Sequence, residues 1–305
     1  MKNPKAQIIQ IKHVLDEENS EFLHYYEEDQ DKFVYCFFGD LEIDGNLRLD
    51  WEGYRDAKNF AEGFYTKYNI HRGWLISKFN TLTLNGKEVE NPVEKAGIVP
   101  GDTIHTINGY PVLPPKGNKV LKPDGSIDTD IMFAGFPKEV KVEYIHLGES
   151  AATTVEPCYI DDKPTLGINR YFFEQEESPE LHGICVFGNL KVNGSVVNRT
   201  LEGGPMLYVS GNLEADNLIA GGAFVEVKGT TTVKHYVYGH YNDGITRLGD
   251  VVAKAVIGAD HDISFGNVTG SCFIDYDLDE FFDPKYKNPI DAMLDGADII
   301  ADVKE

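Results

Sequence analysis

Two histidines in the C-terminal half of the chain have a spacing that could bring their side chains together. His240 and His261 are 21 residues apart, close to the period of a repeat described below. If they lie in register on successive coils, their side chains would be roughly 5 Å apart along the stack. Imidazole and carboxylate groups are ligands of divalent metals. The candidate metal ligands are His240, His261, Asp243 and Asp260, with Asp262 nearby in the sequence.

The same residues have a structural interpretation. His and Asp side chains at a corner can hydrogen-bond to the backbone of the turn. Zinc requires ligands that converge in tetrahedral geometry, and a coil spacing does not specify such convergence. A metal site would favour a metal-dependent or polysaccharide-acting β-helix enzyme, whereas a polar corner would only shape the fold.

Other signatures of catalysis are absent from the sequence. It contains no GxSxG, GxxxxGK[ST] or HExxH motif, so no hydrolase elbow, phosphate loop or zinc-protease helix is predicted. Lys and Arg are sparse on the repeated segments, which makes an acidic polysaccharide a poor substrate. We therefore expect a non-enzymatic protein with no catalytic residues and no cofactor.

The four cysteines do not form a recognisable framework. They lie far apart, without a CxxC pair, so neither a zinc ribbon nor a set of disulfides is predicted. Buried reduced thiols of a cytoplasmic protein are the simplest interpretation. The four residues are Cys36, Cys158, Cys185 and Cys272.

The histidines belong to a repeat of about twenty residues. Each repeat begins with a glycine, then a short polar residue and an apolar residue. The starting glycines are Gly39, Gly188, Gly211, Gly229, Gly249 and Gly266. A β-rich repeat of this length predicts a parallel β-solenoid, and a β-sandwich with evenly spaced turns is the alternative.

Apolar columns indicate which side chains face the solenoid core. Residues two and four places after each glycine would share the inner face of a strand. The first column is Leu41, Leu190, Leu213, Thr231, Val251 and Val268. After a corner, a third column is expected at Leu47, Val196, Ile219, Val237, Ile257 and Ile274. The polar residue after each glycine is expected to bond to turn backbone or to stack in a ladder.

The first two repeats are 149 residues apart, so an inserted domain is expected between them. The predicted organisation is an N-terminal cap with the first coil, an inserted domain, the remaining coils, and a C-terminal cap over the open end of the stack. These segments are 1–54, 55–165, 166–280 and 281–305.

A motif in the insertion resembles a known family. In AGIVPGDTIHTINGYPV (96–112), Pro100-Gly101 suits a tight turn and Asn108-Gly109 suits a hairpin. The whole string resembles the PDZ family, in the form found in many bacterial proteins. The resemblance implies an α+β domain that adds a partner's C-terminal peptide to a sheet edge and holds its carboxylate in a nest of backbone N–H groups.

The family's carboxylate loop is an apolar-Gly-apolar turn before the groove strand. In this chain the best match to the turn is residues 61–64, and residues 65–68 follow as the groove strand. This match implies a peptide-binding set of Glu62, Gly63, Phe64, Tyr65, Thr66 and Lys67. Glu62 departs from the pattern, because it places a carboxylate beside an anion site. TLGI (165–168) is a competing match. A helix in 126–136 would form the other wall with Ile127, Ile131 and Met132, and the chain itself filling the groove is the alternative.

Two stretches of the repeat, YVYGHYNDG (236–244) and VIGADHDISF (256–265), resemble uncharacterised bacterial solenoid proteins. Some of these are polymer-forming or bactofilin-like, and others lie near toxin systems. The resemblance supports the solenoid fold more than any activity. Together with the acidity of the chain, it motivates the hypothesis of an immunity-type inhibitor of a basic toxin.

Charge restricts the partners. The formal net charge is −22, which disfavours nucleic acid and anionic membranes and favours a basic partner. No secretory signal or membrane-spanning run is evident, so a cytoplasmic location is expected. We therefore predict a mainly β fold, a parallel β-solenoid with an inserted α+β PDZ-like domain. Its expected function is that of a protein- or peptide-binding scaffold or adaptor, with self-association through the solenoid ends as a further hypothesis.

Overall fold

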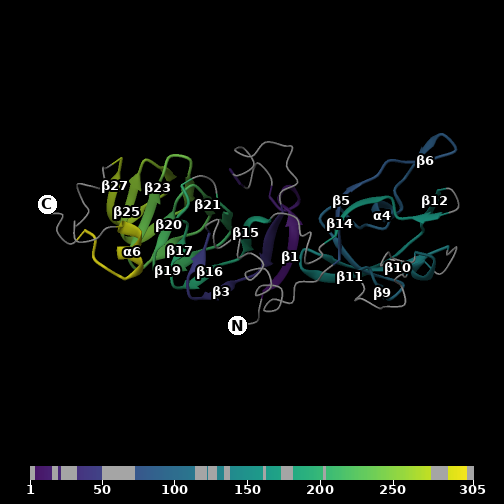
Figure 1. Cartoon of the computed structure of the whole chain (residues 1–305), viewed down its shortest axis with the longest axis horizontal. Coiled ribbons are helices and arrows are strands. Elements are labelled where there is room, and N and C mark those ends of the chain that lie inside the picture. Colours follow the sequence, from purple (N-terminus) through teal and green to yellow (C-terminus); the bar gives the residue numbers. More distant parts are fainter. Residues whose placement is uncertain are drawn as a thin grey trace.

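The computed structural model describes most of the chain, and the fold is mainly β. Its largest feature is a parallel β-solenoid, with a separate antiparallel sheet beside its N-terminal end (Figure 1). The described residues are 4–15, 20–21, 33–49, 73–113, 122, 129–133, 138–160, 163–172, 181–201, 204–275 and 288–300.

The first four coils of the solenoid contribute three strands each. The first has β2 (Phe33–Phe38), β3 (Leu41–Asp44) and β4 (Leu47–Arg48), and the second has β15 (Leu181–Phe187), β16 (Leu190–Asn193) and β17 (Val196–Val197). The third has β18 (Met206–Val209), β19 (Leu213–Ala215) and β20 (Leu218–Ala220), and the fourth has β21 (Phe224–Val227), β22 (Thr231–Val233) and β23 (Tyr236–His240). In the last two coils the second and third strands merge, giving β24 (Ile245–Leu248) with β25 (Val251–Ala259), then β26 (Asp262–Ser264) with β27 (Val268–Ile274).

The first coil pairs with the second across the insertion, as the repeat predicts. Leu41 lies beside Leu190 and Leu47 lies beside Val196, in parallel register. β2 pairs with β15 in the same way. The chain therefore leaves the stack after its first coil and resumes it at the next level.

The first apolar column is confirmed at every coil. Leu190, Leu213, Thr231, Val251 and Val268 are stacked register partners above Leu41. The third column is out of register at three positions. In the sixth coil Cys272 is the register partner of Val256, while the predicted Ile274 lies beside Gly258 and still packs against the core. The other two errors arise because the corners of the third and fifth coils are one residue shorter. Leu218 and Val256 take the inward places, and the predicted Ile219 and Ile257 pack on the outer face instead.

The polar residues after the starting glycines form the predicted ladder from Asp40 to Thr230 and again between Asp250 and Asn267. The backbone N–H of Asn189 donates to Asp40 Oδ1 at 2.8 Å, and that of Asn212 donates to Asn189 Oδ1 at 2.9 Å. Glycine precedes each rung because the coils approach closely there. A Cβ on Gly188 would lie 2.5 Å from the carbonyl carbon of Gly39, so a larger residue would force the coils apart.

The inserted segment forms its own antiparallel sheet with strand order β11-β10-β8-β5-β14. Its strands are β5 (Trp74–Phe79), β8 (Thr103–Ile107), β9 (Tyr110–Pro111), β10 (Val140–His146), β11 (Glu149–Val155) and β14 (Ile168–Phe172). Two hairpins, β6 (Leu82–Leu84) with β7 (Lys87–Val89) and β12 (Cys158–Ile160) with β13 (Lys163–Thr165), and two short helices, α4 (Pro92–Lys95) and α5 (Thr129–Met132), complete it. Because β14 pairs with β5, the sheet extends beyond the predicted boundary at residue 165.

A buried glutamine joins the inserted sheet to the solenoid. Gln7 lies on β1 (Lys5–Gln10), which pairs antiparallel with β2 and covers the N-terminal edge of the stack. Its amide nitrogen donates to the carbonyl of Gly101, and its oxygen accepts from the N–H of Gly148, both at 2.9 Å. Leu75 of β5 also belongs to the solenoid core cluster. The two parts are therefore connected through both polar and apolar contacts.

The C-terminal helix α6 (Pro289–Leu294) does not cover the end of the stack as expected. It packs on the flank of the solenoid, where Ile290 and Met293 join a buried cluster with Ile219 and Tyr238. The prediction failed because the outward side chains of the coils are apolar on this flank, and burying them needs a covering helix. The N-terminal η1 turn (Ile11–His13) directly follows β1.

Candidate functional site

Most residues of the predicted peptide groove lie outside the described part of the chain. Glu62, Gly63, Phe64, Tyr65, Thr66, Lys67 and Ile127 all belong to this undescribed set. Of the helix wall, Ile131 on α5 is 37% exposed, whereas Met132 is fully buried in the core of the inserted sheet. Met132 is thus a packing residue rather than part of a groove.

The competing turn, Thr165-Leu166-Gly167-Ile168, is described and directly precedes an edge strand. Gly167 has a φ of +64°, a backbone conformation that favours glycine. Its N–H donates to Thr165 Oγ1 at 3.1 Å. The chain then continues into β14, which pairs with β5 and stands at one end of the sheet.

Asn91 holds this turn in place. Its side-chain nitrogen donates to the carbonyl of Gly167 at 2.6 Å, and its Oδ1 accepts the N–H of Val93 at 3.0 Å as the N-cap of α4. A Cβ on Gly167 would lie 2.7 Å from both the Asn91 amide nitrogen and Leu82. The turn therefore has a single conformation fixed by its neighbours. The Asn91-Pro92 pair is a sequence signal for the start of this helix.

The two candidate metal-binding histidines are not register partners, so the condition for a shared site along the stack is not met. His240 lies beside Ala259 on the next coil, and His261 lies two residues further along, after the corner at Asp260. Asp243 and Asp260 are exposed. Among the described residues, no group of three or more His, Cys, Asp or Glu side chains is placed to hold one metal ion.

Both histidines bond to protein groups at the corner. One ring nitrogen of His240 lies 3.1 Å from the Asn198 carbonyl oxygen. The ring nitrogens of His261 lie 3.0 Å from the Tyr241 carbonyl oxygen and 2.8 Å from Thr246 Oγ1. These contacts match the structural interpretation, in which histidines satisfy turn backbone.

Burial keeps these histidines neutral. Desolvation lowers the pKa of His240, and it lowers the pKa of His261 to about 4, with the nearby His240 contributing in the same direction. The His261 ring lies against Gly239 and Gly244, where a Cβ would come within 2.4 Å of ring atoms. Glycine at these two positions therefore leaves room for the His261 ring.

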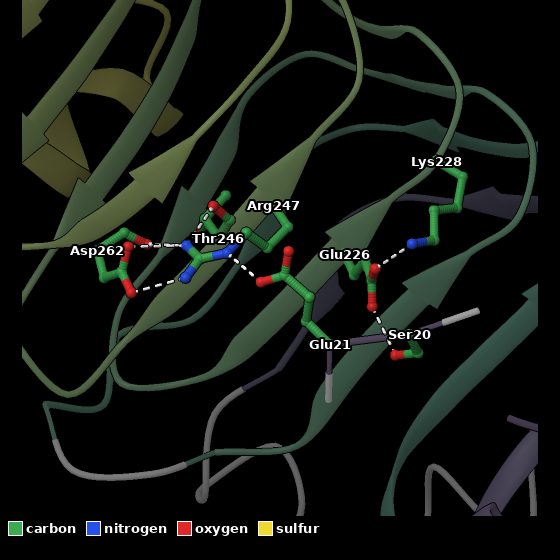
Figure 2. A network of polar contacts seen from close by, with 7 residues as sticks. All are labelled: Ser20, Glu21, Glu226, Lys228, Thr246, Arg247 and Asp262. Carbon is green, nitrogen blue, oxygen red and sulfur yellow. Dashed lines mark hydrogen bonds and ion pairs between the residues drawn. The ribbon is translucent and has the colours of Figure 1, made fainter. Parts of the chain in front are cut away.

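A polar network on the solenoid sheet with strand order β1-β2-β15-β18-β21-β24-β26 was not predicted (Figure 2). Glu226 accepts a hydrogen bond from Ser20 Oγ at 2.6 Å and pairs with Lys228. The hydroxyl and carboxylate of this contact are almost fully buried. The contact anchors the segment at residue 20 to the sheet.

The second half of the network is centred on Arg247. Its guanidinium binds both carboxylate oxygens of Asp262, at 2.8 and 2.7 Å, and its Nε binds Glu21 at 2.6 Å (Figure 2). These bonds lower the pKa of Asp262. No sequence pattern announces them, because Glu21 and Arg247 are 226 residues apart.

A second unpredicted polar contact lies in the inserted sheet. Asp102 is almost fully buried, and its Oδ1 lies 2.7 Å from His146 Nδ1 while its Oδ2 accepts the N–H of Val99. Burial raises the pKa of Asp102, and the bonds to Val99 and His146 act in the opposite direction. The pair lies at the PGD turn beside Gly101, where an added Cβ would lie 3.1 Å from the His13 side chain and 3.4 Å from that of Ile9.

Comparison with protein-family models, with curated proteins and with solved structures finds no match. Within the described residues, no helix has the length and apolar character needed to cross a membrane.

Proposed function

We propose that the chain is a peptide-binding scaffold in which the inserted sheet acts as a PDZ-like module and the solenoid holds it. The observation that carries the proposal is the arrangement of edge strand β14 after the turn at Gly167. An edge strand can accept an added strand through its backbone. At the turn before it, the Gly167 N–H donates to Thr165 Oγ1, so a terminal carboxylate would take the place of that hydroxyl as the acceptor. A partner's C-terminal peptide would therefore extend along β14.

The contacts of the turn support this proposal. Asn91 fixes the carbonyl of Gly167, so the turn is ordered before a peptide arrives. A preorganised site loses less conformational entropy on binding. We therefore prefer TLGI (165–168) as the carboxylate loop, although it is the weaker of the two sequence matches, and not residues 61–68.

The solenoid gives the module a rigid base. Gln7 and Leu75 connect the inserted sheet to the first coil, so a captured peptide would be presented in a fixed orientation. We propose an adaptor on this basis. The net charge of −22 favours a basic partner, and an immunity-type inhibitor of a basic toxin is the specific form of the proposal.

A C-terminal peptide library screened against the full chain tests this function. We expect selected peptides to bind wild-type protein and to lose at least about tenfold in affinity with Gly167→Ala, because a Cβ would displace the turn. Gly86→Ala is the matched control, since Gly86 also has a positive φ (+75°) but has open space around it.

Circular dichroism and thermal melting would show whether both variants keep the wild-type fold. Equal peptide affinity for the two folded variants would overturn the assignment of the turn. A library with no binders, or peptides with free and amidated C-termini binding equally, would contradict carboxylate capture.

A further inference from the structure

A cleft on the solenoid flank lies at the boundary between the coils and helix α6. Arg48 of β4 is the register partner of Val197 on β17, so both side chains stand on the same face of the sheet. Residues two apart on an extended chain share a face, which adds Asn46 and Arg199. The outward direction is established because Val197 packs in the cluster that α6 covers.

The cleft has a volume of about 390 Å³ and is lined by Asn46, Arg48, Val197, Arg199 and Leu294. This size falls in the range of small-molecule sites, roughly 300–1,000 Å³. Val197, which is 2% exposed, gives it an apolar floor, and Leu294 at the end of α6 forms a side. Guanidinium and amide groups form the remaining wall.

The placement of arginine is uneven in this chain. The sequence contains 6 arginines and has a net charge of −22, yet two of the arginines line one cleft. Guanidinium groups bind carboxylate and phosphate through paired N–H donors, which lysine cannot reproduce. Two positive groups at an apolar hollow in an acidic protein select for an anion.

A carboxylate on α6 competes for Arg199. Asp291 on α6 lies 2.7 Å from an Arg199 guanidinium nitrogen, and both side chains are partly exposed. Exposed ion pairs of this kind are weak, on the order of 0–1 kcal/mol. A ligand with two anionic groups, or with one group of higher charge, could therefore displace Asp291 from Arg199.

We propose that this cleft binds a small oxyanion ligand, a carboxylate or phosphate compound whose body rests on Val197 and Leu294. Arg48 and Arg199 hold the anionic group, and the side-chain amide of Asn46 adds a donor. The site is independent of the peptide edge at β14, because it lies on the solenoid flank beside α6.

Isothermal titration of the full chain with inorganic phosphate and, in a separate arm, with citrate tests the proposal. Sodium chloride at matched ionic strength is the reference. We expect saturable binding of at least one probe, and the stronger probe identifies the anionic group. Arg48→Gln and Arg199→Gln should each weaken binding about tenfold or more, since each removes a charge-assisted pair.

Two further variants separate a site from general electrostatics. Asp291→Asn should tighten binding by up to about fivefold, because it removes the competing carboxylate. Lys87→Gln removes the same charge as the arginine variants from an exposed hairpin of the inserted sheet and should leave the affinity unchanged. The proposal is overturned if neither probe saturates, if the arginine variants bind like wild type, or if Lys87→Gln weakens binding as much as they do.

Discussion

Thr231 is the one polar member of the first core column, and it illustrates how a single side chain can limit the stability of the solenoid. It is fully buried between Leu213 and Val251, and within the described structure its hydroxyl has no hydrogen-bond partner. A buried hydroxyl without a partner loses its hydration and gains nothing in return.

We predict that Thr231→Val stabilises the protein by about 1 kcal/mol, because valine keeps the shape and removes the unsatisfied group. Chemical denaturation measures the effect. Thr246→Val is the control, since the Thr246 hydroxyl is equally buried but bonds to His261, and its loss should destabilise. Destabilisation by Thr231→Val would contradict the assignment.

The histidine corner predicts how stability changes with pH. Because the pKa of His261 is lowered to about 4 in the folded state and is about 6.5 when unfolded, the unfolded state binds the proton first. The neutral His261 ring therefore contributes its full stabilisation to the folded state above pH 6.5. This stabilisation is lost as the pH falls towards 4, and the unfolding free energy falls by about 3 kcal/mol at most. His240, whose pKa is also lowered, acts in the same direction.

Unfolding free energies of wild type and His261→Gln, measured from pH 7 to pH 4, isolate this contribution. The difference between the two proteins should shrink as the pH falls. A difference that stays constant over this range would show that His261 titrates normally. The sequence was sufficient to single out His240 and His261 as corner residues. It did not predict their register, because the register depends on corner lengths that the repeat spacing does not specify.

At the scale of elements, the polar ladder aligns the coils at one corner. Asn212 accepts the N–H of Thr230 through Oδ1 at 2.8 Å, while its own N–H donates to Asn189. We predict that Asn212→Ala costs about 1 kcal/mol, because one backbone donor loses its partner. Asn212→Asp keeps the acceptor and should retain most of the stability in the same denaturation experiment. Equal losses in both variants would exclude the ladder bond as the cause.

The strands and the apolar columns could be predicted from the sequence better than the corner lengths and the position of the covering helix. The position of Leu41, Leu190 and Leu213 two places after a glycine was sufficient to place them in the core. Ile219 was misplaced because a corner one residue shorter turns the next side chain outward, and an apolar residue suits either face. α6 was expected at the end of the stack, since nothing local to Ile290 or Met293 identifies the flank that they cover.

At the scale of the whole molecule, the two ends of the solenoid differ. The N-terminal end is covered by β1, which pairs antiparallel with β2, and by the inserted sheet, which contacts Gln7 and contributes Leu75 to the core. At the C-terminal end the last described strands are β26 and β27. Head-to-tail stacking needs both ends of the solenoid to be accessible.

We therefore predict that the chain does not grow into head-to-tail filaments. Sedimentation velocity over a wide range of concentrations should give species of limited size, because a covered N-terminal end cannot accept a coil from another copy. Electron microscopy of the same samples checks the result. Long unbranched fibres at high concentration would contradict this account and would show that β1 is displaced.

The central claim, that a peptide adds to the edge strand β14, is tested most directly by hydrogen–deuterium exchange of the full chain with and without a library-selected peptide. Backbone N–H groups become protected when a new strand pairs with them. We predict slower exchange concentrated in residues 166–172, with the solenoid coils unchanged. Protection that falls elsewhere, with exchange in 166–172 unaltered by a saturating peptide, would contradict the claim.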